Sequence, residues 1–491
     1  MVVRHGFVHP QTQQDAQRRS SALCHKTSGP LASTLDACYA TLIPQLVELR
    51  NLEWQERTAM VDEAVPAKGM PEIRVKKIVP TRNSIACTIG YDTNLEPYFK
   101  SSLFHVSYGF SVEEIPESVL SIPVLGLIAP VAWTVGATVS AGGVDSKFLA
   151  SLRKVGNIMQ GMYPGISIST SIRCTAIDTP WPSGGDRDCL LYTGGIDSTS
   201  SLIRNLGPKL ALASIRGTPD LPLSDDRLWD RTERGLQPFL GSTGVERQVI
   251  ETNALDVVNL GSLNAPLKSI LSVGWWENLS HGLVLLSLCA PFTYVGKTRR
   301  MMIASSYSQS DSEPWGSTPA SDESVAWGSV TTVHDSFDLQ RIEKIQRIIA
   351  PYMLQHPGLV QFRVCTGKRE KRLASGTLNC GVCQKCVRTM LGLMYSGIDP
   401  AACGFPPPDF AEIKAGVTSG RLIPPGIYSL RIIHDSKRPP DRELVVRYPA
   451  YAEFLSWFYD RKIPQGSDRK WVSWFAPKGS RRRKLLRDVF R

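Results

Sequence analysis

The sequence predicts an α/β protein built on a parallel sheet that helices cover. Between residues 185 and 305, short apolar runs of strand length alternate with helical stretches, and this alternation is typical of parallel strands joined by crossover helices. The run at 189–192 leads directly into two glycines and a hydroxyl-rich helix start. At 491 residues the chain is long enough to bury a full core and to form two or three domains.

The strands and helices of this sheet can be placed along the chain from their apolar patterns. They are expected, in chain order, at 189–192, from 196, at 209–215, 228–240, 246–251, 282–288 and 301–305. Ligands of open parallel sheets bind beyond the carboxyl ends of the strands. The turn at 193–198, the strand end at 214–217 and the pair 305–306 are therefore predicted to share one rim.

The turn after the first of these strands has the composition of a phosphate-binding loop. Gly194 and Gly195 let the backbone turn sharply and approach a ligand, while the free N–H groups and dipole of the next helix favour an anion. The carboxylate of Asp197 can hold Mg²⁺, and the hydroxyl of Ser198 can donate to a phosphate oxygen. We expect these two to be the catalytic residues. The residues expected to bind the cofactor are Thr193, Gly194, Gly195, Ile196, Asp197, Ser198 and Thr199.

A second motif supplies candidate metal ligands. It is a C-x2-C-x2-C run, which offers three corners of a tetrahedron from one tight turn, made by Cys380, Cys383 and Cys386. We expect Cys365 to be the fourth ligand and Zn²⁺ to be the metal. Cys403 is the rival, but it lies beyond an expected helix at 387–394. A closed four-cysteine site favours a structural role; disulfides, or an iron–sulfur or redox-active group, are the alternatives.

The two motifs together resemble a known family. The run 193–198, Thr-Gly-Gly-Ile-Asp-Ser, resembles the SGGxDS signature of the PP-loop ATP pyrophosphatases, with Thr193 keeping the hydroxyl of the first Ser. With the cysteine cluster downstream, residues 185–395 resemble 7-cyano-7-deazaguanine synthase and its relatives, although this chain has a longer Cys365–Cys380 interval and a long N-terminal extension. The resemblance implies an adenine nucleotide alpha hydrolase-like fold, ATP and Mg²⁺ as cofactors, and a homodimer.

The resemblance also implies a reaction. In that family ATP activates a carboxylate as an acyl adenylate, ammonia converts it to an amide, and a second ATP-dependent round dehydrates the amide to a nitrile. We therefore expect a ligase that adenylates a carboxylate substrate, small or protein-borne, and releases AMP and pyrophosphate. Two alternatives stay open. One is a tRNA-modifying thiolase with a labile iron–sulfur cluster or a persulfide cysteine, and the other is a non-catalytic ATP-binding component of a multi-protein system.

Other residues near the predicted rim are weaker candidates. Arg341 and Lys344, one turn apart on an expected helix, could neutralise polyphosphate in the transition state, or could simply face solvent. His281, at a helix start, is either a site residue or a packing or capping residue. A loop too long to be a mere connector carries Tyr307, Trp315, Gly316, Ser317 and Asp322, and His334 with Asp335 follows it.

Composition divides the chain into four segments. They are a partly disordered N-terminus at 1–70, an α+β accessory domain at 71–182, the PP-loop domain with its zinc site at 183–403, and a Pro-rich linker with a helical basic tail at 404–491. The uncharged stretch 118–144 is long enough to span a bilayer. Because prolines and glycines interrupt it, we expect buried strands and turns and no membrane span. The N-terminus has no apolar core of the signal-peptide type, and the eleven cysteines form no even disulfide framework. We therefore expect a cytoplasmic protein.

The formal charge of +11 is concentrated at one end of the chain. Residues 461–491 hold eleven Lys or Arg and two Asp, a net charge of +9, which leaves about +2 for the rest. The cluster from Arg481 to Lys484 could bind RNA, an acidic protein partner or a membrane surface, and a solvated end is the other interpretation. The near-neutral remainder argues against a large tRNA-binding surface.

Overall fold

The chain divides into two units, residues 1–64 and 65–491. The computed structural model describes residues 69–164, 166, 171–271, 273–310, 313–365, 377–419, 422 and 428–461, all in the second unit. The expected disordered start at 1–70 lies outside the described residues except for its last two positions. The basic cluster 481–484 lies outside them as well.

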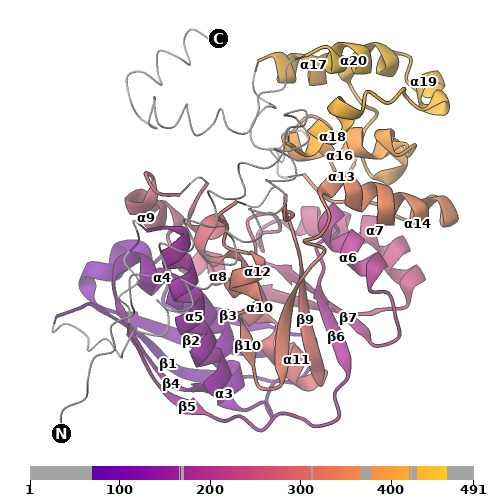
Figure 1. The fold of residues 1–491 in the computed structure, drawn as a ribbon. Helices are drawn as coiled ribbons and strands as arrows, with labels where there is room; N and C mark the ends of the chain where they lie inside the picture. The colour runs from indigo at the N-terminus through magenta and orange to yellow at the C-terminus, as the bar shows by residue number, and fades with distance from the viewer. Residues whose placement is uncertain are drawn as a thin grey trace, which may run out of the picture. The chain divides into compact units, whose positions relative to one another are not determined.

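One sheet of eleven strands runs through the described unit, in the order β10-β11-β9-β6-β7-β8-β3-β2-β1-β4-β5 (Figure 1). Its strands are β1 (Glu72–Pro80), β2 (Ser84–Tyr91), β3 (Leu103–Ser107), β4 (Thr138–Asp145), β5 (Ile172–Ile177), β6 (Arg187–Leu191), β7 (Leu210–Arg216), β8 (Glu246–Thr252), β9 (Thr298–Ala304), β10 (Ala326–Trp327) and β11 (Val330–Asp335). Most neighbouring pairs are parallel, so the predicted α/β class is confirmed.

The four strands predicted from the sequence, together with β11, which was not predicted, form the parallel half of this sheet. Numbered one to five along the chain, β6, β7, β8, β9 and β11 lie side by side in the order 3-2-1-4-5, and all four contacts between them are parallel. The chain moves outward from β6 through β7 to β8 and then returns to the other side of β6 with β9. The point between β6 and β9, where the direction reverses, is where open sheets of this kind bind ligands.

Alternate residues of these strands face opposite cores. In β6, Cys189 and Leu191 belong to one buried cluster, whereas Leu190 belongs to the other. In β9, Met301 and Met302 divide in the same way. Because successive side chains of a strand point to opposite faces, both faces of the sheet are covered.

The other half of the sheet comes from the region predicted as an accessory domain. Its strands β1, β2 and β3 are antiparallel, and β4 and β5 add in parallel beyond β1. The two halves meet where β3 pairs with β8, through Val106 with Thr252 and Ser107 with Glu251. The boundary at residue 182 stays a prediction, but the strands on its two sides share one sheet.

Helices cover the sheet and extend beyond it. Those up to β9 are α3 (Glu117–Leu120), α4 (Ile122–Val135), α5 (Ser146–Met162), α6 (Ile196–Arg204), α7 (Asp226–Thr243), α8 (Ala254–Val257), α9 (Leu260–Asn264), α10 (His281–Leu288) and α11 (Ala290–Val295), with single turns η1 (Thr93–Tyr98), η2 (Ala265–Leu267) and η3 (Trp276–Ser280). Those after it are α12 (Pro319–Asp322), α13 (Arg341–Lys344), η4 (Ile345–Ile349), α14 (Ala350–Gln355), α16 (Gln384–Tyr395), η5 (Pro400–Cys403), α17 (Phe410–Thr418), α18 (Tyr428–Ser436), α19 (Arg442–Arg447) and α20 (Ala450–Tyr459).

The uncharged stretch 118–144 is a helix pair and a strand, so the expectation of strands and turns was wrong for most of it. Pro123 falls in the first turn of α4, where an N–H would have no intrahelical partner. Pro130 lies inside the same helix, and its carbonyl accepts from Thr134 Oγ1 at 2.8 Å. The glycine pair lies within β4 and does not end it, although the register of its pairing with β5 shifts between Ser140 and Gly143.

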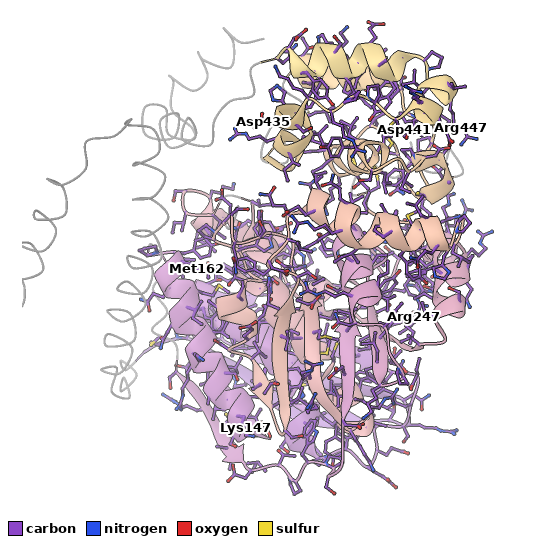
Figure 2. The ribbon with its side chains drawn as sticks, turned by 45° about the vertical axis from the view of Figure 1, so that its right-hand side comes forward. Lys147, Met162, Arg247, Asp435, Asp441 and Arg447 are labelled. Atoms are coloured by element: carbon purple, nitrogen blue, oxygen red, sulfur yellow. The ribbon has the colours of Figure 1, made fainter. Side chains whose placement is uncertain are left out.

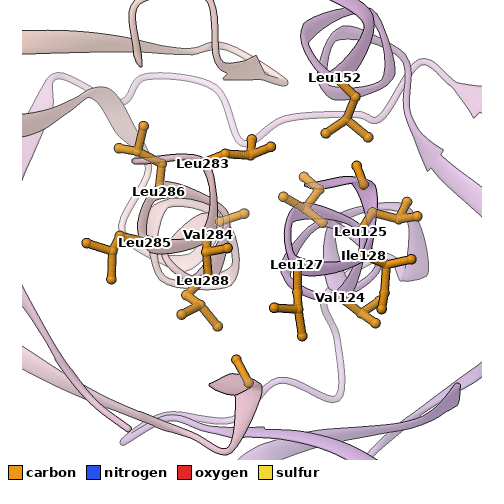
Figure 3. Close-up of a cluster of buried hydrophobic side chains, with 14 of the residues drawn as sticks. Val124, Leu125, Leu127, Ile128, Leu152, Leu283, Val284, Leu285, Leu286 and Leu288 are labelled. Carbon is orange, nitrogen blue, oxygen red and sulfur yellow. The ribbon is translucent and has the colours of Figure 1, made fainter. Parts of the chain in front are cut away.

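Two helical stretches, Glu117–Val135 and Trp276–Val295, are long and apolar enough to cross a membrane by length and composition. The most apolar part of each stretch is mostly buried inside the protein, as in core helices. The buried share is 89% for Glu117–Val135 and 83% for Trp276–Val295. Figure 3 shows the contact between them, where leucine, isoleucine and valine side chains of α4 and α10 pack together. They therefore give only weak evidence for a membrane span.

The C-terminal helices are fastened to the chain that follows α16. Asp441 caps α19 by accepting from the N–H groups of Glu443 and Leu444 at 3.0 and 3.1 Å. Arg447, at the end of the same helix (Figure 2), forms an ion pair with Asp399. The hydroxyl of Tyr448 also donates to Asp399, at 2.7 Å.

The contact between α4 and α10 gives a test of the fold. Ala is a better helix former than Gly by about 0.5–1 kcal/mol, but a Cβ on Gly126 would overlap Oγ and Cβ of the fully buried Ser287. Overpacking costs about 1–3 kcal/mol, so the overlap outweighs the propensity. We expect Gly126→Ala to lower the free energy of unfolding measured in urea.

The matched changes follow from the same geometry. Ser287→Gly added to Gly126→Ala should recover part of the loss, because the overlapping atoms are then gone. Gly207→Ala serves as the control, since a Cβ there would meet only Asn205 O, at 3.9 Å. Equal stability of Gly126→Ala and Gly207→Ala would contradict the packing described.

Candidate functional site

The predicted phosphate turn lies at the end of β6, at the reversal point of the sheet. Gly194 has φ +73°, a conformation that L side chains rarely adopt, and a Cβ on it would come within 2.6 Å of Leu236 Cδ1. Gly195 is less crowded, because the atom nearest to a Cβ added there would be Thr193 Oγ1, at 3.5 Å. α6 begins directly afterwards, with the N–H of Thr199 bonded to Gly195 O at 2.9 Å. The first-turn N–H groups of such a helix have no intrahelical acceptor and can meet an anion.

The hydroxyl groups of the turn hold its shape. Ser198 Oγ lies 3.2 Å from Thr193 Oγ1 and donates to Gly195 O at 3.3 Å. Ile196 and Thr199 have buried side chains, so the side chain of neither faces solvent. Of the seven residues predicted to bind the cofactor, Asp197 alone directs an ionisable side chain toward other charged groups.

Asp197 forms ion pairs with both basic residues of α13. Arg341 bonds it through Nη2, with Nε 3.3 Å from Oδ1, and Lys344 Nζ lies 3.4 Å from the same oxygen. Burial alone would raise the pKa of Asp197, but Arg341 and Lys344 outweigh that effect, so its pKa is lowered. The sequence therefore placed Arg341 and Lys344 correctly near the turn, and the interpretation of both as a solvent-facing surface was wrong.

Lys344 is the most constrained member of this group. Its side chain is 1% exposed, and its ammonium also donates to Ser305 O at 2.5 Å, at the end of β9. Burial lowers its pKa, and Asp197 offsets part of that effect. α13 starts at a capping box made by Gln340 and Glu343 and continues into the π-helical turn η4, a feature often found at functional sites.

Positive charge exceeds negative charge around the turn. Arg388 of α16 is close enough for Arg341 and Asp197 to affect its pKa, which burial lowers to about 9. The cations of this group outnumber its carboxylates by five to four. The cations are Arg341, Lys344, Arg363, Lys385 and Arg388, and the carboxylates are Asp197, Asp220, Asp335 and Asp338. An excess of fixed cations beside exposed helix N–H groups suits a bound anion. Sequence reasoning missed Arg388, because that motif was examined for its cysteines.

The structure brings the four predicted cysteines together. The sulfur atoms of Cys365, Cys380, Cys383 and Cys386 all lie within 4.8 Å of one another. The distance between Sγ atoms is 3.7 Å for Cys365–Cys383, 3.8 Å for Cys380–Cys386 and 3.4 Å for Cys383–Cys386. Tetrahedral zinc with bonds of about 2.3 Å requires sulfur separations of roughly 3.8 Å. The cluster could therefore hold one metal ion such as zinc.

Cys403, the rival ligand, is outside this cluster. Its thiol donates to Asp399 O at 3.3 Å, and burial raises its pKa to about 12. Cys380 Sγ, by contrast, lies 3.8 Å from Cys386 Sγ inside the cluster. Position in space therefore separates Cys403 from the four cluster cysteines.

Three of the remaining candidates form a buried hydrogen-bonded group, and the others lie outside it. His334 Nδ1 lies 2.7 Å from Asp322 Oδ2, to which Ser317 Oγ donates at 2.6 Å, and all three side chains are buried. Burial lowers the pKa of His281, whose Nδ1 has no hydrogen-bond partner among the described residues. Tyr307 and Trp315 make an edge-to-face ring contact at 5.7 Å. These contacts are explained by packing and support no particular chemistry.

Comparisons with protein-family models, with curated proteins and with solved structures gave no match.

Replacing any of the four cluster cysteines with serine should remove the metal and lower the melting temperature. The physical reason is that a structural metal site contributes folding free energy directly. Elemental analysis should find one zinc ion per chain in the purified wild-type protein and almost no zinc in Cys380→Ser. Cys403→Ser is the matched control and should keep both metal and melting temperature. Iron in place of zinc, or metal loss in Cys403→Ser, would refute the assignment.

Proposed function

We propose that this protein is an ATP-dependent enzyme of the PP-loop type that adenylates a carboxylate. The observation that carries the proposal is the position of the turn 193–198. It follows the first of five parallel strands ordered 3-2-1-4-5, at the reversal point where such sheets bind nucleotides. An adenine nucleotide alpha hydrolase-like fold and a relationship to 7-cyano-7-deazaguanine synthase belong to this proposal.

The proposed reaction needs no protein nucleophile. A carboxylate oxygen of the substrate attacks the α-phosphorus of ATP, the bond from that phosphorus to the β-bridging oxygen breaks, and pyrophosphate leaves with the electron pair. Ammonia or an amine then attacks the acyl carbon of the adenylate, displaces AMP and gives the amide. The protein contributes position and charge, which are the main catalytic terms in phosphoryl chemistry of this kind.

The residues around the turn would divide this work. The backbone N–H groups at 195–198 would hold the phosphates, and Arg341, Lys344 and Arg388 would balance the charge that develops on departing pyrophosphate. Asp197 would exchange its present cations for Mg²⁺ as the phosphates take them over, since carboxylate oxygen is the ligand that Mg²⁺ prefers. The cysteine cluster would hold structural zinc, and its thiols would stay reduced in the cytoplasm.

The reaction can be tested without knowing the substrate. Purified protein is incubated with Mg²⁺, ATP labelled at the α-phosphate, ammonia and a metabolite extract. We expect AMP and pyrophosphate in equal amounts, with the adenylated carboxylate identified by mass spectrometry. Formation of ADP and phosphate, or no cleavage with any fraction of the extract, would refute the proposal and favour a non-catalytic nucleotide-binding role.

Asp197→Asn should lower the rate of pyrophosphate release by about 100-fold or more, because it removes the charge proposed to hold the metal. Asparagine is preferable to alanine. Both changes leave the buried Lys344 ammonium without its carboxylate, and breaking a buried pair in this way costs about 3–5 kcal/mol of stability. The amide oxygen of asparagine can still accept a hydrogen bond from Lys344 or Arg341, whereas alanine offers no acceptor.

The control for this change is Asp186→Asn. Asp186 forms an exposed ion pair with Lys209 near the amino end of β6, away from the turn at its carboxyl end. We expect full pyrophosphate release from this variant. Near-normal release from Asp197→Asn, with both variants still folded at the assay temperature, would remove Asp197 from the proposed mechanism.

A further inference from the structure

The segment 362–365 belongs to both the phosphate turn and the cysteine cluster. The backbone N–H of Arg363 donates to the carbonyl of Gly194 at 2.8 Å. Two residues further on, Cys365 is one of the four cluster cysteines. The backbone that holds one side of the turn is therefore also the backbone that carries a metal ligand.

Asn379 locks this segment in place. Its side chain is fully buried and uses both ends: Nδ2 donates to Phe362 O at 2.7 Å and to Gly404 O at 2.9 Å, and Oδ1 accepts from Val364 N at 2.9 Å and Cys365 N at 3.2 Å. The next residue, Cys380, is itself a cluster cysteine. A satisfied buried amide of this kind transmits position, because moving any partner breaks a hydrogen bond that no water can replace.

A second connection runs through α16. Cys383 is its N-cap and Cys386 lies in its first turn, so a metal ion bound by both would fix that end of the helix. Arg388 follows two residues later and interacts electrostatically with Asp197. A third contact is α7, where Leu236 packs against Gly194 and Gly235 packs against Leu378.

We propose that metal binding at the cysteine cluster and nucleotide binding at the phosphate turn strengthen each other. The inference rests on the proposed function, because it requires a nucleotide at the turn. A bound metal holds Cys365 and α16, which fixes the Gly194 carbonyl and Arg388 in the arrangement that a nucleotide needs. By linkage, a bound nucleotide must tighten metal binding by the same factor.

The test uses the intact zinc-bound protein. Zinc affinity is measured by equilibrium competition with a coloured chelator, with and without saturating α,β-methylene-ATP, an analogue that cannot be cut between the α and β phosphates. Mg²⁺ is kept in excess so that the nucleotide itself does not carry zinc. Binding of the analogue is measured separately by calorimetry. We expect bound α,β-methylene-ATP to raise zinc affinity by about 5-fold to 150-fold, the usual range for coupled sites.

A matched pair of variants locates the connection. Asn379→Asp keeps the acceptor for Val364 and Cys365 but loses the donors to Phe362 O and Gly404 O. It should bring the effect of the analogue on zinc affinity close to onefold. Asn253→Asp makes the same exchange at an asparagine that joins β8 to β3, where Oδ1 accepts from His105 N and Nδ2 donates to Leu103 O. It should leave the effect unchanged.

The outcomes separate the two proposals. Nucleotide binding with unchanged zinc affinity in the wild type overturns the inference and leaves the proposed function standing. Absence of nucleotide binding overturns both. Because the wild-type comparison decides the matter by itself, failure of Asn379→Asp to fold would not remove the test, and an equal effect in both variants would overturn the assigned path.

Discussion

A lysine ammonium buried to 1% exposure cannot remain in the protein interior without compensation, and the site is organised around that requirement. The Lys344 ammonium is compensated by an ion pair with the carboxylate of Asp197 and by a hydrogen bond to the carbonyl of Ser305. The first partner stands at the start of α6, directly after β6, and the second follows β9. Both can be reached from one ammonium only because β6 and β9 are neighbours in the sheet. The strand order and the buried ion pair therefore require each other, and α13 is held over the reversal point by both.

The same ion pair leaves positive charge in excess. Asp197 neutralises one cation, whereas Arg341, Lys344 and Arg388 all act on it. Asp335 adds a second carboxylate, which accepts from Ser201 at 2.5 Å and from Ser336 at 2.7 Å and also acts on Lys344. Three cations therefore face two carboxylates. Fixed like charges held together at one rim repel each other and lower stability. An anionic ligand would relieve that repulsion, which is the physical basis for proposing phosphates there.

Much of the parallel half could be predicted, because β6, β7 and β9 contain short apolar runs that glycine, proline or polar residues separate. β11 was missed, because its sequence Val-Thr-Thr-Val-His-Asp is largely polar. β6, β7 and β8 begin within two residues of where the sequence placed them. The helix α4 was mistaken for strands because a proline in the first helical turn looks, in sequence, like a breaker. The pairing of β3 with β8 could not be predicted, since it joins segments more than a hundred residues apart and carries no local signal. The same limit applies to Asn379 and Arg388, which lie beside the cysteines but act through partners that are distant in sequence.

The cysteine cluster lies beside a glycine turn that has few side chains of its own to hold its shape. Gly194 and Gly195 contribute no side chains, so the turn owes its shape to its neighbours: the hydroxyl of Ser198, the N–H of Arg363 and the side chain of Leu236. Two of these lie on α6 and α7, which pack on the sheet. The third lies on the segment 362–365, which forms no helix or strand and so lacks the regular hydrogen bonds that would hold it. Asn379 and the cysteine cluster supply that rigidity, so a site suited to metal binding stands where a flexible glycine turn needs an external support.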